Sequence, residues 1–296
     1  EGRVYFTSYD GYIYALDTQT GKEVWTFPKK DQSDSNNNQF EVEEAETAAV
    51  AEPEKVADPA PDAAVAPADA QPAEEAVAAA EGGATPEEET PAKQGSQETG
   101  SFSYSSPTIF EKTLYVGNLD HRLYAINIED GSMLWRFKTD APVTSSPRVV
   151  DGTLYFGSND GNVYSIDSRK IRVNWKSKTQ HWVNSSALIL GERLYIGSND
   201  KNLYAFNLKS GRAVWKHGTY GDVISIPAPY KNLIIMAGGS GDGRIYAVEE
   251  RNGRLFWSYK TGGKIESDPV IVGDKLFVSS TDGYLYSFTI LKTQSK

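Results

Sequence analysis

Hydrophobic and polar positions alternate in short runs, and one alternating stretch occurs six times along the chain. Its clearest copy, LYFGSNDGNVYSID at residues 154–167, has two runs of aromatic and β-branched residues separated by a polar Asp-Gly pair. The alternation predicts two strands that each bury one face, and the Asp-Gly pair predicts a tight hairpin turn because it tolerates a positive φ. The other copies begin at Val4, Leu114, Leu194, Leu233 and Leu276.

A tryptophan follows each of the first five hairpins and predicts a further strand in each unit. These residues, which we expect to dock one unit against the next, are Trp25, Trp135, Trp175, Trp215 and Trp257. They are 110, 40, 40 and 42 residues apart, so the first step equals one period plus an insertion of 70. A period near 40 with four strands per unit is typical of a β-propeller.

A short segment centred on serine precedes each hairpin from the second onward, and we interpret it as the innermost strand of its unit. The segments are YSSP at 104–107, TSSP at 144–147, NSSA at 184–187, ISIP at 224–227 and ESDP at 266–269. Small polar side chains suit a crowded channel lining. We therefore expect the serines to be structural rather than nucleophilic, since no triad partner recurs near them.

Together these patterns predict an all-β fold, a β-propeller of about six four-stranded blades. The first unit lacks the innermost strand and the last lacks the Trp strand, so we expect 22 strands and a ring whose closure is either imperfect or completed by residues outside this sequence. An open sheet edge of this kind is an aggregation hazard. The predicted units span residues 1–28, 101–139, 140–179, 180–219, 220–261 and 262–290.

Residues 29–100 interrupt the repeat with a stretch rich in Ala, Glu and Pro. They hold 18 acidic and 4 basic residues, a net charge of −14 against −10 for the whole chain. Such a stretch cannot bury enough apolar surface to offset its chain entropy, so we predict a disordered insertion. We interpret it as a tolerated loop in preference to a partner-binding segment. The rest of the chain has a net charge of about +4, the difference between these two values. So small an excess does not indicate binding to nucleic acid or to a membrane surface.

The remaining composition sets broad limits. The chain has 296 residues and no Cys, which suits one large domain and excludes a disulfide framework. It contains no run of 18 apolar residues, so we expect no membrane span within it. Because it begins at Glu1 without Met, we expect a processed or trimmed product.

The segment that leads to each Trp has landmarks of its own. Residues 15–25 read Ala-x-Asp-x-x-Thr-Gly-Lys-x-x-Trp. The Ala, Gly and Trp recur in residues 125–135, 205–215 and 247–257. This pattern resembles the PQQ-type repeats of quinoprotein β-propellers. The third unit departs from it, with Ser165 for Ala and Ile171 for Gly, so we expect a looser or differently shaped outer turn there.

The resemblance implies two alternative functions. Quinoprotein dehydrogenases bind pyrroloquinoline quinone (PQQ) with calcium and usually have eight units, and many carry a disulfide, whereas this chain has fewer units and no Cys. It looks more like the non-catalytic branch, which includes the bacterial outer-membrane assembly scaffold BamB and extracytoplasmic sensor domains. We therefore expect a non-enzymatic scaffold for protein partners, without a cofactor, in the periplasm or elsewhere outside the cytoplasm. The alternative is a PQQ-binding oxidoreductase or a ligand-sensing domain.

Strand parity places the candidate binding residues. The hairpin turns and the connections from each Trp strand to the next innermost strand must emerge at the same end of the blades, which we call the top face. The insertion leaves from this face as well. Loops held by a rigid scaffold are favoured binding sites. The candidate partner-binding residues on the top face are Arg122, His181, Trp182, Tyr220, Asp222 and Lys264.

Three further patterns have structural interpretations that we prefer. The three histidines are His121, His181 and His217. They lie in different units without metal-ligand spacing, so we expect structural roles. Glu266 and Asp268 have carboxylates that suit calcium, but their spacing resembles no calcium loop, and we expect solvated or capping roles. Gly238–Gly243 precedes a strand rather than a helix, which indicates a widened hairpin turn and not a phosphate-binding loop.

Overall fold

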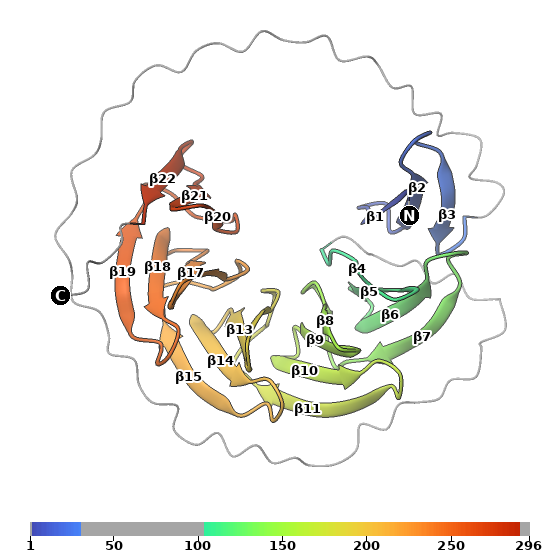
Figure 1. Ribbon diagram of the computed structural model, residues 1–296, viewed down its shortest axis with the longest axis horizontal. Coiled ribbons are helices and arrows are strands. Elements are labelled where there is room, and N and C mark those ends of the chain that lie inside the picture. The colour runs from blue at the N-terminus through green and yellow to red at the C-terminus, as the bar shows by residue number, and fades with distance from the viewer. Residues whose placement is uncertain (1, 31–103, 291–296) are drawn as a thin grey trace, which may run out of the picture.

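The computed structural model describes residues 2–30 and 104–290, and within these ranges it contains 22 β-strands and no helix. The strands form six antiparallel sheets, each ordered as its strands follow in the chain. The sheets stand side by side as the blades of an arc (Figure 1). This confirms the prediction of an all-β propeller of about six blades with incomplete first and last blades. The described residues include no helix long and apolar enough to cross a membrane.

Each complete blade has a short first strand followed by three longer ones. Blade 1 contains β1 (Arg3–Thr7), β2 (Ile13–Asp17) and β3 (Glu23–Phe27), and blade 2 contains β4 (Thr108–Phe110), β5 (Thr113–Asn118), β6 (Arg122–Asn127) and β7 (Met133–Lys138). Blade 3 contains β8 (Arg148–Val150), β9 (Thr153–Gly157), β10 (Asn162–Asp167) and β11 (Arg172–Lys178), and blade 4 contains β12 (Leu188–Leu190), β13 (Arg193–Ser198), β14 (Asn202–Asn207) and β15 (Ala213–Gly218). Blade 5 contains β16 (Ala228–Tyr230), β17 (Leu233–Ala237), β18 (Arg244–Glu249) and β19 (Leu255–Lys260), and blade 6 contains β20 (Val270–Val272), β21 (Lys275–Ser279) and β22 (Leu285–Thr289).

The first strand of a complete blade lies toward the centre of the arc, and the fourth strand forms the outer rim (Figure 1). Within the described residues, β1 has no inner neighbour in blade 1 and β22 has no outer neighbour in blade 6. Among the described residues, the arc is open between these two blades (Figure 1). The predicted insertion, residues 29–100, falls outside the described residues except for Lys29 and Lys30.

The innermost strands differ from the prediction in their boundaries. They begin only after the serine segments, at Thr108, Arg148, Leu188, Ala228 and Val270. Four of the five segments end in proline, which has no N–H to donate and so interrupts strand pairing. A serine makes the backbone contacts instead: the buried Ser145 hydroxyl lies 2.8 Å from both the nitrogen and the carbonyl oxygen of Gly157. These contacts support the expected structural role of the serines.

The hydrophobic core lies between neighbouring blades. Alternate residues of each strand point to opposite sides of the sheet, so one blade contributes apolar side chains to two interfaces. Between blades 2 and 3, for example, Tyr115 and Leu123 pack in one cluster with Phe156 and Ile166. The residues at one repeated position, Leu114, Leu154, Leu194, Ile234 and Leu276, are 0–1% exposed. Burial of each such side chain contributes about 1.5–3 kcal/mol, so the repeated interfaces stabilise the arc.

The outer-strand tryptophans lie at the same interfaces. The indole Nε1 atoms of Trp25, Trp175 and Trp215 donate to the carbonyl oxygens of Ile128, Leu208 and Glu250, at 3.0, 3.0 and 3.1 Å. Gly131 lies against the Trp25 ring with a φ of 73°, and a Cβ there would lie 2.8 Å from the indole Cδ2. Glycine is therefore needed both for the left-handed backbone and for the approach of the ring.

The outer turn of the third unit differs from the others, as expected from its sequence. Ile171 stands at the glycine position and adopts a φ of 51°, which is unfavourable for a β-branched residue. Pairing of β10 with β11 extends to Asp167 and Arg172, one pair further than between β14 and β15. The turn has the same number of residues as its counterpart in blade 4, so the difference lies in its shape and in the side chain at the glycine position.

Candidate functional site

A hydrogen bond between an aspartate and a tyrosine braces every described hairpin turn on the top face. The Asp carboxylate accepts from the hydroxyl of the Tyr four residues later, at 2.5–2.8 Å. The pairs are Asp10–Tyr14, Asp120–Tyr124, Asp160–Tyr164, Asp200–Tyr204, Asp242–Tyr246 and Asp282–Tyr286. In blades 1, 3, 4 and 6 the other oxygen of the same carboxylate accepts a hydrogen bond from the backbone N–H of the residue two positions after the Asp. In these four blades both carboxylate oxygens therefore hold the turn, whereas Oδ1 of Asp120 and of Asp242 is buried without a hydrogen-bond partner.

Three of these tyrosines remain hydrogen-bond donors well above neutral pH. Burial, with the hydrogen bond to the neighbouring carboxylate, raises the pKa of Tyr164, Tyr204 and Tyr246 far above the ordinary tyrosine value. A neutral hydroxyl can donate to the carboxylate, whereas a phenolate would repel it. The braces therefore hold the top-face turns under physiological conditions.

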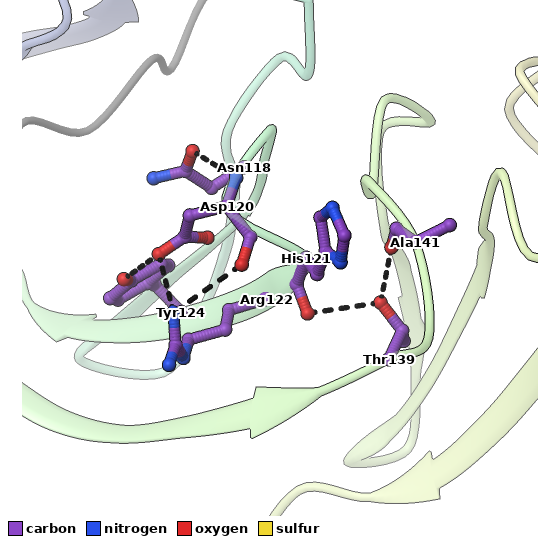
Figure 2. A network of polar contacts seen from close by, with 7 residues as sticks. All are labelled: Asn118, Asp120, His121, Arg122, Tyr124, Thr139 and Ala141. Carbon is purple, nitrogen blue, oxygen red and sulfur yellow. Dashed lines mark hydrogen bonds and ion pairs between the residues drawn. The ribbon is translucent and has the colours of Figure 1, made fainter.

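In blades 2 to 5, a threonine just after the outer strand ties the hairpin turn to the connection that follows. The Thr139 hydroxyl lies 3.0 Å from the carbonyl oxygen of His121 and 2.6 Å from that of Ala141 (Figure 2). Thr179, Thr219 and Thr261 make the equivalent two contacts in blades 3, 4 and 5. Turns and connections therefore meet at one end of each blade, which is the arrangement that strand parity predicted.

Two candidate residues are engaged within this framework. Arg122 donates to the Asp120 carboxylate at 3.1 Å and lies 3.3 Å from the Asp120 carbonyl oxygen, beside Tyr124 (Figure 2). Asp222 is half-buried, and its carbonyl oxygen accepts the N–H of Gly239 at 2.6 Å. The structure thus gives both residues contacts that shape the turns.

The other four candidates project from the connections. His181 and Trp182 are adjacent and exposed, with ring centroids 5.3 Å apart, and Trp182 is 49% exposed. Tyr220 is 62% exposed, and the guanidinium of Arg244 lies 5.6 Å from the centre of its ring. Lys264 is exposed and lies three residues after Thr261, just as Trp182 lies three residues after Thr179. The structure distributes these residues over the connections after blades 3, 4 and 5.

Sequence reasoning missed three exposed tyrosines at the same end of the blades. Tyr9 is 82% exposed, Tyr104 is 61% exposed and Tyr284 is 60% exposed. The Tyr9 and Tyr104 rings meet edge to face, with centroids 6.1 Å apart. The signal that could have found them was an aromatic residue within a polar turn or connection, where strand alternation does not require one. With Trp182 and Tyr220, these tyrosines form a series of exposed aromatic side chains along the top face.

The histidines and carboxylates do not fit a metal site. Within residues 2–30 and 104–290, no three His, Asp or Glu side chains gather closely enough to hold an ion. His217 is buried, its Nδ1 lies 2.8 Å from the carbonyl oxygen of Gly253, and burial lowers its pKa. The turn carboxylates are bound to tyrosines. This donor set does not match the calcium ion that accompanies the quinone in quinoprotein dehydrogenases.

A cavity of about 530 Å³ lies at the inner rim, against the innermost strands of blades 3 to 6. Apolar side chains line most of it, with Arg148 and Asp268 as its charged members. The Asp268 carboxylate accepts the backbone N–H of Ile226 at 2.6 Å, so it links blade 6 to blade 5. The inner rim is therefore a second concave surface. The Asp268 carboxylate that lines it is engaged in holding two blades together.

One family of known proteins matches most of the chain. The family model described as outer membrane protein assembly factor BamB matches residues 77–226 and 222–294, which include blades 2 to 6. No curated protein sequence shows significant similarity to the chain.

Several solved structures share the fold. BamB from Moraxella catarrhalis has a TM-score of 0.63 at 16% identity, with 98% of this chain and 70% of that chain covered. The computationally designed protein Ika8 has a TM-score of 0.66 at 12% identity, with 98% and 69% covered. A chain of the mitotic checkpoint complex has a TM-score of 0.54 at 17% identity, with 60% and 57% covered. At these identities the likeness establishes the fold alone.

Proposed function

This chain belongs to the PQQ-like family described as outer membrane protein assembly factor BamB, and we propose that it is a non-enzymatic scaffold that binds a protein partner through its top face. We place this activity outside the cytoplasm, in the periplasm, and in the assembly of outer-membrane proteins. The family description supports that placement, and the rigid arrangement of the turns suits a scaffold.

The observation that carries the proposal is the series of exposed aromatic side chains on the top face. Tyr9, Tyr104, Trp182 and Tyr220 are between 49% and 82% exposed. Tryptophan and tyrosine are enriched at protein interfaces and contribute much of the binding energy there. Burying such rings lowers the free energy of the complex, and in the chain alone these rings stay exposed to water. A protein surface that covers them is the ligand that this face suits best.

The loops that carry these aromatic residues are already ordered, so they lose little conformational entropy when a partner binds. The Asp200–Tyr204 bond of 2.6 Å fixes a hairpin turn, and Thr179 fixes the connection that carries Trp182. Association costs less entropy when the loops that make the contacts are already ordered. The framework therefore supports binding without rearrangement of the blades.

Cationic side chains on the top face narrow the kind of partner. Lys264 is exposed, and the Arg244 guanidinium lies 5.6 Å from the Tyr220 ring centre. Complementary charge guides association and discriminates against wrong partners. Arg244 already lies 3.8 Å from the Asp242 carboxylate, so we assign an acidic side chain of the partner to Lys264 and apolar side chains to the exposed rings.

Site-specific photocrosslinking in producing cells tests the proposal. A photoreactive amino acid replaces Trp182 in one variant and Tyr220 in another. The matched control carries it at Phe256, which is 53% exposed on the outer strand β19. We expect both top-face positions to link to the same envelope protein, and Phe256 not to. Linkage only from Phe256, equal linkage from all three positions, or no linkage from the top face would contradict the proposal.

A further inference from the structure

The cavity at the inner rim contains a positive charge that the repeated architecture does not require. The residue that opens the innermost strand is Thr108 in blade 2, Arg148 in blade 3, Leu188 in blade 4, Ala228 in blade 5 and Val270 in blade 6. Arg148 is the only charged member of this set, and it lines the cavity. Because these blades share one architecture, the fold alone does not account for a charged residue at this position of blade 3.

The Arg148 side chain is available for a ligand. It is exposed, and no other residue in the described part of the chain forms a hydrogen bond or an ion pair with its guanidinium. By contrast, the guanidinium groups of Arg122, Arg169 and Arg193 each lie within 3.1, 2.7 and 3.6 Å of a carboxylate oxygen. A guanidinium binds a carboxylate through two parallel N–H···O hydrogen bonds. Arg148 is therefore a candidate to bind an anionic group at the inner rim.

Apolar side chains from three neighbouring blades form most of the wall around Arg148. They are Val149 and Val150 of blade 3, Leu188 and Ile189 of blade 4, and Ile226, Pro227, Ala228 and Pro229 of blade 5. Six of these eight are half-buried, so part of each side chain remains accessible. Ser145, Ser185 and Ser225 are only 0–1% exposed and do not line the cavity. The wall therefore suits an aliphatic body, whose burial would remove apolar surface from water.

Hydrogen bonds between blades hold the inner rim in shape. The Ser146 hydroxyl oxygen accepts the N–H of Ser106 at 2.9 Å, and the Ser186 hydroxyl oxygen accepts the N–H of Ser146 at 2.8 Å. Asp268 has the equivalent place in blade 6 and accepts the N–H of Ile226 at 2.6 Å. These bonds join blades 2, 3 and 4, and blades 5 and 6. The cavity is therefore preformed, which lowers the entropy cost of binding.

We infer that the inner-rim cavity binds a small amphipathic monoanion, an aliphatic chain that ends in one carboxylate. The carboxylate pairs with the Arg148 guanidinium, and the chain lies against Val149, Leu188 and Ile189. The cavity volume of about 530 Å³ falls within the range of small-molecule sites. Asp268 lines the same cavity and disfavours a second negative charge on the ligand. PQQ, which carries several carboxylates, therefore matches the cavity less well.

A protein C-terminus could also bring a carboxylate on an apolar chain, but it matches the lining less well. A peptide buries backbone N–H and C=O groups, which cost free energy unless they find hydrogen-bond partners. The apolar wall supplies few such partners, and an aliphatic chain needs none. The cavity includes neither Trp182 nor Tyr220, so this proposal and that of the top-face scaffold can fail independently.

Decanoate is a direct probe of the cavity. We expect saturable binding to the full chain by isothermal titration calorimetry, with new hydrogen-exchange protection in β8 and β12. Arg148→Met keeps an apolar stem but removes the charge and should weaken binding at least about tenfold, whereas Arg148→Lys should retain part of the affinity. Decyltrimethylammonium has the same chain with the opposite charge and should bind at least about tenfold more weakly than decanoate. Arg212→Met is the matched control, because Arg212 is an exposed arginine just before the outer strand β15, and should leave affinity unchanged.

Four outcomes would overturn the inference. They are absence of saturable binding at millimolar decanoate, unchanged affinity of the Arg148→Met protein, equal affinity for decanoate and decyltrimethylammonium, and protection confined to strands outside the inner rim. Tighter binding of an apolar tetrapeptide with a free C-terminus than of decanoate would also overturn it, since the occupant would then be a protein C-terminus. Arg148 is exposed, so the folded state of both variants can be verified by an unchanged melting temperature.

Discussion

The indole Nε1 of Trp215 donates a hydrogen bond of 3.1 Å to the carbonyl oxygen of Glu250, and so ties the outer strand of blade 4 to a turn of blade 5. The ring is 3% exposed, and its centroid lies 5.7 Å from that of Tyr195. Gly253 makes room for it, because a Cβ at that position would lie 2.5 Å from the indole Cε3. A single side chain thus combines apolar burial, an aromatic contact and a hydrogen bond between blades.

Replacing Trp215 should destabilise the fold according to how much of the side chain is removed. Trp215→Ala should lower the free energy of unfolding by about 3–5 kcal/mol, since a large buried side chain is removed. Trp215→Phe should cost less, about 0.5–1.5 kcal/mol, because the Glu250 carbonyl loses one of its two donors and keeps the Arg193 guanidinium at 2.6 Å. Urea unfolding followed by circular dichroism measures both. Trp182→Ala is the control, and its half-exposed ring predicts a change within about 0.5 kcal/mol; an equal loss in the control would contradict the docking role.

Two glycines at equivalent turns should respond differently to alanine. Gly21 and Gly131 have φ values of 66° and 73°, so both substitutions cost about 1–2 kcal/mol for the left-handed backbone. Only Gly131 lies against a ring, with the Trp25 indole 2.8 Å from the position of a Cβ, whereas Gly21 has no atom within 4 Å. Gly131→Ala should therefore cost about 1–3 kcal/mol more than Gly21→Ala. Equal losses in urea unfolding would show that the ring does not constrain the turn.

The sequence was sufficient to predict the architecture, because hairpins and outer strands each have a short sequence pattern that recurs in every blade that contains them. Alternation around the Asp-Gly pairs located the hairpins, and the period of Trp175 and Trp215 located the blades. The innermost strands were placed too early because the serine segments are extended without pairing as strands. Ser145 contacts Gly157 through its side chain, and the proline that ends four of the five segments was the sequence signal against strand pairing there.

The top face was only partly predictable. Strand parity identified the correct end of the blades, and it located exposed residues such as Trp182 and Tyr220. It could not separate them from Arg122, since the ion pair with Asp120 depends on side-chain direction within the turn. Tyr9 was missed because a turn tyrosine has no effect on strand periodicity.

Alkaline pH should weaken the hairpin braces. Burial raises the pKa of Tyr204 in the folded chain, so its contribution to stability is complete below the unfolded tyrosine pKa of about 10 and is lost as pH rises through the folded value. Melting temperatures measured from neutral pH to about pH 11 should therefore fall above about pH 10. Tyr204→Phe should flatten part of that decline, whereas Tyr220→Phe, at an exposed position, should not. A decline of the same steepness in Tyr204→Phe would contradict the assignment.

Addition of PQQ and calcium should leave the tryptophan fluorescence of the protein unchanged. Each turn carboxylate accepts a tyrosine hydroxyl, as in the 2.6 Å contact between Asp160 and Tyr164, and no three His, Asp or Glu side chains of the described residues gather as a metal site. We also expect no reduction of an electron-accepting dye in the presence of alcohols or sugars. Saturable, calcium-dependent quenching would establish quinone binding, and dye reduction would make the protein an oxidoreductase.

The central claim is that the top face binds a protein partner, and its most direct test is the affinity of the partner identified by crosslinking. Isothermal titration calorimetry compares the natural chain with Trp182→Ala/Tyr220→Ala and with the outer-strand control Leu134→Ala/Phe256→Ala, whose side chains are 51% and 53% exposed. Loss of interface aromatic residues worth about 2 kcal/mol or more should weaken binding about 30-fold in the top-face variant. The control should bind as the natural chain does. Equal affinity of all three proteins, or a loss confined to the control, would contradict the claim.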